Sequence, residues 1–181
     1  FDAGGGDGAL REALDRIQLE AENGVREGAI HVVLTDIGVS ADRVAIPMIL
    51  ATGAVHSHLV RQKLRTFTSL NVRSGECLDV HYFAVLIGVG ATTINAYLAE
   101  ESLRARHDHN LFPDLAAEDC IAQYKQAVNQ GILKVMSKMG ISVLSSYRGG
   151  ANFEAVGLSR ALVAEFFPGM PSRISGIGLA G

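Results

Sequence analysis

The sequence predicts an α/β protein built from parallel β–α–β units. Short runs of β-branched and apolar residues alternate with longer segments of helical periodicity, and the connections between them are short. This alternation implies right-handed crossovers and a parallel sheet. The 181 residues are 48% hydrophobic and 19% charged, which is enough apolar chain to bury a core.

Four helices and three strands are expected in the first half of the chain. The first helix has apolar residues at helical spacing, with Asp7 placed to cap its start and Gly28 to end it. Pro47 suits the first turn of the second helix, and Ser74 is placed to cap a third, largely buried one. The helices are expected at residues 9–28, 47–64, 74–88 and 98–107, and the strands at 29–36, 66–72 and 91–97.

A polar, proline-containing stretch at residues 107–118 predicts a linker between residues 1–106 and 119–181. A long helix is expected after the linker, running to Gly140. It is followed by a strand at residues 141–146 and by another helix within residues 152–167. The glycine-rich start and the end SGIGLAG both look like cuts, so we expect a piece of a longer protein.

Composition excludes several classes of partner. The net charge of −3 gives no reason to expect nucleic acid or an anionic membrane surface. The sequence contains no uninterrupted run of about 20 apolar residues, so no transmembrane helix is expected. The start has no signal-peptide pattern. Cys77 and Cys120 match no ligand spacing, so we expect reduced thiols and a cytoplasmic protein.

Two conspicuous motifs favour structural interpretations. Gly176, Gly178 and Gly181 fit the G-x-G-x-x-G dinucleotide fingerprint, but the prolines before it give little strand character, which disfavours such a site. His56 and His58 would point some 200° apart on a helix, which disfavours a shared metal ion.

The remaining candidates favour packing as well. Cys77 is flanked by Glu76 and Asp79, which oppose a thiolate, so a packed thiol is favoured over a nucleophile. His81 is expected to be a hydrogen-bonded core histidine. His107 and His109 are expected on a solvated face.

The best candidate site follows the expected strand at residues 141–146. Ligands bind at the carboxyl ends of parallel strands, and hydroxyls, a cation and glycines gather there. These residues suit a phosphate-bearing or polar aromatic ligand, and they are Ser145, Ser146, Tyr147, Arg148 and the Gly149–Gly150 pair. Lys138 and Gly140 lie at the opposite end of the strand, and we expect them to end the preceding helix.

Two long stretches resemble the large subunit of the glutamate synthase family. Residues 42–102, DRVAIPMILATGAVHSHLVRQKL and onward, resemble the end of its central domain. Residues 124–178, including KVMSKMGISVLSSYRGG, resemble the start of its FMN-binding (β/α)8 (TIM) barrel. The resemblance therefore assigns residues 1–106 to the central domain, 107–118 to a linker and 119–181 to the barrel.

The resemblance implies an oxidoreductase that makes two glutamates from glutamine and 2-oxoglutarate. FMN and a 3Fe-4S cluster would be its cofactors, and electrons would come from an FAD-containing small subunit oxidising NADPH or NADH, or from ferredoxin. Ser145, Ser146, Tyr147, Arg148 and Gly149 would line the FMN site, whereas the catalytic cysteine and the cluster ligands would lie outside these residues. The isolated piece is expected to be inactive.

Three departures from the family pattern concern local detail. Ala151 stands where a larger residue is expected, and His-Ser-His at residues 56–58 replaces a run of three histidines. The turn after Asp36 lacks its usual charged residue. Two alternatives remain open: another FMN-barrel oxidoreductase, and an α/β binding module without redox chemistry.

Overall fold

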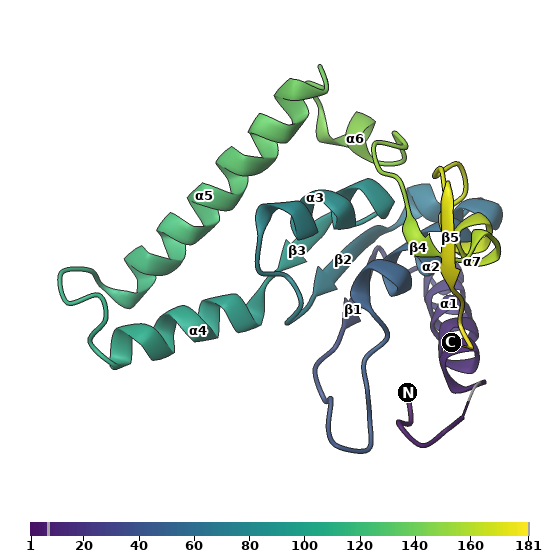
Figure 1. Ribbon diagram of the computed structural model, residues 1–181, viewed down its shortest axis with the longest axis horizontal. Helices are drawn as coiled ribbons and strands as arrows, with labels where there is room; N and C mark the ends of the chain where they lie inside the picture. The colour runs from purple at the N-terminus through teal and green to yellow at the C-terminus, as the bar shows by residue number, and fades with distance from the viewer. Residues whose placement is uncertain (7, 181) are drawn as a thin grey trace.

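A computed structural model describes residues 1–6 and 8–180. Its centre is a three-stranded sheet whose strands are parallel, as predicted, and lie in the order β1–β2–β3 (Figure 1). The strands are β1 (His31–Thr35), β2 (Ser69–Arg73) and β3 (Thr93–Asn95). Val33 lies beside Asn71 in the register, and Asn71 lies beside Thr93.

The expected helices of this unit are present as α1 (Ala9–Arg26), α2 (Met48–Arg61), α3 (Val80–Val89) and α4 (Tyr97–Asp108). Gly28 follows the end of α1 with a φ of 99°, as predicted, and Asp7 lies outside the described residues. The predicted cap of α3 is wrong: Asp79, not Ser74, accepts a hydrogen bond from the Tyr82 amide. Ser74 lies six residues before the helix begins, and its hydroxyl donates a hydrogen bond to Asp36 instead.

The first core lies between the sheet and helices α1 to α3. Alternate strand residues, Leu34, Leu70 and Val72, pack there against Val55 of α2 and Leu86 of α3. Burial of this apolar surface is the main force that holds the sheet to its helices. The other alternate residues of the strands face away from this core.

The second core joins segments that lie far apart in the sequence. Phe166 and Val163, on α7 (Arg160–Phe166), pack with Leu14 of α1 and Leu50 of α2. The Ser57 hydroxyl donates a hydrogen bond to the Phe166 carbonyl at 2.9 Å. Helix α7 therefore packs against α1 and α2.

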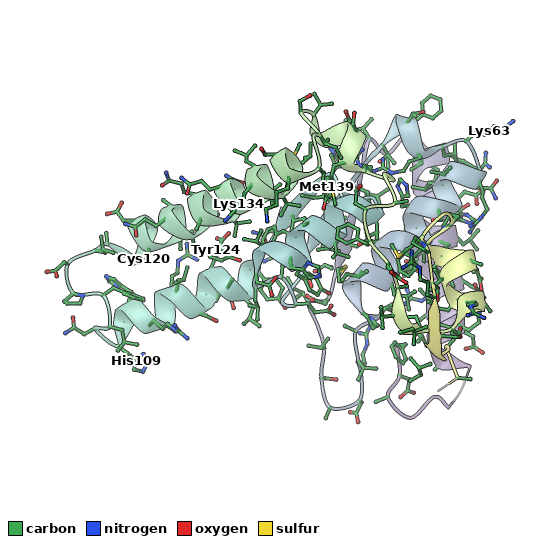
Figure 2. The ribbon with its side chains drawn as sticks, turned by 45° about the horizontal axis from the view of Figure 1, so that its top comes forward. Lys63, His109, Cys120, Tyr124, Lys134 and Met139 are labelled. Carbon is green, nitrogen blue, oxygen red and sulfur yellow. The ribbon has the colours of Figure 1, made fainter. Side chains whose placement is uncertain are left out.

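Helices α4 and α5 (Ala117–Lys138) form an antiparallel pair that extends away from the sheet (Figure 1). Residues 109–116 form the turn between them, inside the predicted linker. Tyr124 lies between the two helices in Figure 2, and its hydroxyl donates to the Leu78 carbonyl at 3.3 Å. No helix of the described chain is both long and apolar enough to span a membrane.

The predicted strand at residues 141–146 is wrong. Helix α5 ends in a Schellman motif, in which Gly140 has a φ of 68° and the Ile141 amide donates to the Met136 carbonyl. Residues 141–143 are irregular, and α6 (Leu144–Tyr147) is a single helical turn. Tyr147 is 1% exposed and packs against Ala84 and Ile87 of α3, so tertiary packing overrides the β-propensity of this run.

The chain ends in a separate two-stranded parallel sheet of β4 (Val156–Leu158) and β5 (Ile174–Ile177). Gly176 lies inside β5, so a strand does occupy this stretch, contrary to prediction, whereas Gly181 lies outside the described residues. The sheets establish a mixed α/β fold with parallel strands.

Candidate functional site

The five predicted site residues point in different directions. Ser145 and Ser146 are exposed on α6, whereas Tyr147 is buried and lies edge-on to Phe153, with ring centroids 6.1 Å apart. The Gly149 amide donates to the Gly88 carbonyl at 2.9 Å, which fixes this loop to the end of α3. Arg148 is the one charged residue of the five, and its charge acts on His56 and Arg65.

Arg148 belongs to a cationic corner that we define by His56, Arg65 and Arg148. The Arg65 guanidinium donates to His56 Nδ1 at 2.9 Å, to the Thr68 carbonyl at 2.7 Å and to the Gly90 carbonyl at 2.8 Å. Because Arg65 donates to Nδ1, neutral His56 carries its proton on Nε2. The corner therefore joins the end of α2, the start of β2 and the loop after α6.

Burial and neighbouring positive charge disfavour protonation of His56. Burial first, and then the charges of Arg65 and Arg148, together lower the pKa of His56 to about 4. Burial, followed by the charge of Arg148, lowers the pKa of Arg65 to about 10. In the described part of the chain, neither guanidinium has a carboxylate within 4.0 Å.

A small pocket of about 120 Å³ adjoins the corner. His56, Tyr147 and Gly149 line it together with the aromatic rings of Phe153 and Phe167. The Tyr147 hydroxyl and Arg148 Nε are buried without a hydrogen-bond partner among the described residues. Neither Arg65 nor Arg148 lines this pocket. The unpaired Arg148 Nε and Tyr147 hydroxyl are donors of the kind that a small anion, such as a phosphate or carboxylate group, accepts from.

The pocket is too small for a flavin ring system. Pockets that enclose a whole small-molecule ligand measure about 300 Å³ or more. Ser145 and Ser146 are exposed on the surface, whereas Tyr147 is buried. Of the five predicted residues, only Tyr147 and Gly149 line this pocket, and the FMN-binding role of the five stays a prediction.

The two histidines of α2 have separate structural partners. His58 Nε2 lies 2.6 Å from Glu22 Oε2, whereas His56 is held by Arg65. Within residues 1–6 and 8–180, no group of three or more His, Cys, Asp or Glu residues could hold a metal ion. His81, predicted to lie in the core, is instead exposed and lies edge-on to Phe153.

The cysteines behave as packed thiols. Cys77 is fully buried, and burial is the main cause that raises its pKa to about 12. A thiol with this pKa stays protonated at neutral pH and is a poor nucleophile or ligand. Cys120 is also buried and free, on α5.

A second polar network, which was not predicted from the sequence, lies at the carboxyl ends of the strands. Asp36 accepts hydrogen bonds from the Ser74 hydroxyl at 2.5 Å and the Gly75 amide at 2.8 Å. Glu76 accepts from the Met48 amide at 3.1 Å and from the Tyr82 hydroxyl. Because Met48 begins α2, Glu76 replaces the missing side-chain cap of that helix. Both carboxylates therefore serve to hold loops and helix ends in place.

The pKa of His56 predicts that the chain loses stability in acid. The unfolded chain binds the proton near the ordinary value of 6.5 and the folded chain only near 4. The free energy of unfolding should therefore be highest above about pH 6.5 and fall by about 3 kcal/mol as the pH drops to 4. The measurement is urea unfolding of the original protein and of His56→Asn at several pH values. The variant keeps an acceptor for Arg65 but cannot be protonated, so its free energy of unfolding should fall less in acid. Parallel losses in both proteins would contradict this role of His56.

Comparison with known proteins gives a consistent family. A family profile described as "Glutamate synthase central domain" matches residues 1–159. The chain is 66% identical over 181 residues to the large chain of an NADPH glutamate synthase from Azospirillum brasilense, covering all of this chain and 12% of that one. It is 41% identical over 170 residues to the corresponding large chain of Bacillus subtilis, covering 94% of this chain and 11% of that one. It is 40% identical over 186 residues to a chloroplastic ferredoxin-dependent glutamate synthase of Spinacia oleracea, covering 97% of this chain and 12% of that one.

Proposed function

This chain belongs to the glutamate synthase family, and from this premise we propose that it serves the reductive transfer of the glutamine amide nitrogen to 2-oxoglutarate, giving two glutamates. The observation that carries the proposal is the 66% identity along all 181 residues. The chain spans about an eighth of the length of that relative, so the reaction belongs to the larger protein. The names of the relatives are those of oxidoreductases, which disfavours a binding module without redox chemistry.

The cofactors of the proposal are FMN and a 3Fe-4S cluster. FMN, when bound, would supply hydride transfer, and residues 119–181 would begin the TIM barrel that carries it. Cys77 does not fit a cluster ligand because it is fully buried with a raised pKa, so we assign the cluster to cysteines outside this chain. The two best-matching relatives named here are NADPH enzymes, which favours an FAD-containing small subunit over ferredoxin as electron donor. A cytoplasmic location completes the proposal.

The role that we propose for the predicted site is recognition of an anion. Arg148 would bind the phosphate of FMN or a substrate carboxylate, and Arg65 would add its charge while holding neutral His56 in place. Gly149, fixed to α3, would set the position of Arg148, and buried Tyr147 would anchor the loop. The exposed Ser145 and Ser146 hydroxyls remain free to contact the same ligand from outside the pocket.

Arg148→Ala in the full-length enzyme should lower glutamine- and 2-oxoglutarate-dependent turnover by roughly 10- to 100-fold. The estimate follows from the loss of one charge-assisted hydrogen bond, about 1.5–3 kcal/mol. Steady-state NADPH oxidation and retained flavin per protein are the measurements. Arg148→Lys should recover part of the activity, and Arg104→Ala, which removes an exposed arginine of α4, should leave it unchanged. Full turnover by Arg148→Ala would exclude the cationic corner from the site.

A further inference from the structure

The central sheet has one covered face and one open face. In a parallel sheet of consecutive order, right-handed crossovers place the connecting helices on the same side. The burial pattern agrees, because Leu34, Leu70 and Val72 are buried beneath α1, α2 and α3. The alternate residues form the open face: His31, Val33, Thr35, Ser69, Asn71, Arg73, Thr93 and Asn95.

The open face is polar and internally hydrogen-bonded. His31 Nδ1 lies 2.5 Å from the Ser69 hydroxyl, and the Asn71 amide nitrogen donates to the same hydroxyl at 3.2 Å. The Thr93 hydroxyl donates to Asn71 Oδ1 at 2.7 Å. These contacts run across all three strands, so the open face presents an ordered polar surface with Val33 as its main apolar side chain.

A parallel sheet with one bare face is unusual. Sheets whose strands are all parallel occur almost only with both faces covered. Val33, in the middle of β1, is 58% exposed here, which is far from the usual burial of such a strand position. Something that the 181 residues do not contain should therefore cover the open face.

We propose that the open face is covered by another segment of the same glutamate synthase large chain, outside residues 1–181. The inference rests on the proposed membership of a longer chain, of whose Azospirillum relative the 181 residues cover only 12%. The polar character of the face fits a hydrogen-bonded or hydrated contact between parts of one polypeptide. A lipid surface or the core of an obligate dimer would require a more apolar face.

Thiol accessibility in the full-length enzyme tests whether the face is covered. Val33→Cys and Leu111→Cys form a matched pair, because the two side chains are 58% and 62% exposed in this structure and lie on β1 and in the α4–α5 turn. Peptide-resolved maleimide labelling of the native enzyme should be at least tenfold slower at position 33 than at position 111. Equal rates would overturn the proposal.

Photo-crosslinking identifies what covers the face. A p-benzoylphenylalanine in place of Val33 should crosslink, on irradiation, to a peptide of the same large chain outside residues 1–181. Crosslinks to a second large chain, to a small subunit, or only within residues 1–181 would overturn the proposal. Turnover with glutamine and 2-oxoglutarate is measured on the same preparation, so that failure of the proposed reaction is seen separately from failure of this contact.

Discussion

Phe166→Ala should lower the free energy of unfolding of the chain by about 4 kcal/mol. Phe166 is fully buried in the second core, and the Arg11 guanidinium lies over its ring, 5.3 Å from the centroid. Truncation would remove buried apolar surface and leave a cavity between α1, α2 and α7 that these helices can close only in part. Urea unfolding followed by circular dichroism is the measurement.

Phe67→Ala is the matched control for this prediction. Phe67 is 68% exposed, so its removal should change the free energy of unfolding by no more than about 0.5 kcal/mol. If both alanine variants unfolded at the same urea concentration, the second core would not contribute to the stability of the chain.

Gly90→Ala should cost about 3 kcal/mol or more, through two separate effects. Gly90 has a φ of 134°, a conformation that L residues adopt only with strain of about 1–3 kcal/mol. A Cβ atom at this position would also meet the ring of His56, and such overpacking costs about 1–3 kcal/mol. The displaced ring would lose its hydrogen bond from Arg65, so the cationic corner should be disturbed as well.

Gly28→Ala separates these two effects. Gly28 has a φ of 99°, but an added Cβ would meet no atom within 4 Å, so only backbone strain of about 1–2 kcal/mol should appear. Thermal unfolding of both variants gives the difference. A Gly90→Ala protein as stable as Gly28→Ala would show that His56 does not pack against the loop after α3.

Most of the sheet and its helices could be predicted because local signals and packing agree there. The strand from Ser69 to Arg73 alternates inward and outward side chains, and Pro47 directly precedes α2. Local and global preferences conflicted at residues 141–146, whose β-branched and apolar side chains favour a strand. The burial of Tyr147 against α3 decided that conflict, and periodicity within six residues cannot reveal such a contact.

The candidate site was predicted only in part, for a similar reason. Arg148 was named from the sequence, but its neighbours His56 and Arg65 come from the end of α2 and the segment after it. Helix geometry alone disfavoured a metal ion shared by His56 and His58, and this stays a prediction. Its hydrogen bond with Arg65 depends on the turn between α2 and β2, for which the sequence holds no separate signal.

The fastening of α7 onto α1 and α2 has a consequence for synthesis of the protein. The buried residues of the first core end at Val128, whereas Leu14, Leu50 and Ala54 belong to a core that α7 completes. More than a hundred residues separate Ala54 from α7, which corresponds to on the order of ten seconds of translation. During that interval the apolar residues of α1 and α2 lack this partner, and transiently exposed apolar surface of this kind is prone to aggregation until it is covered.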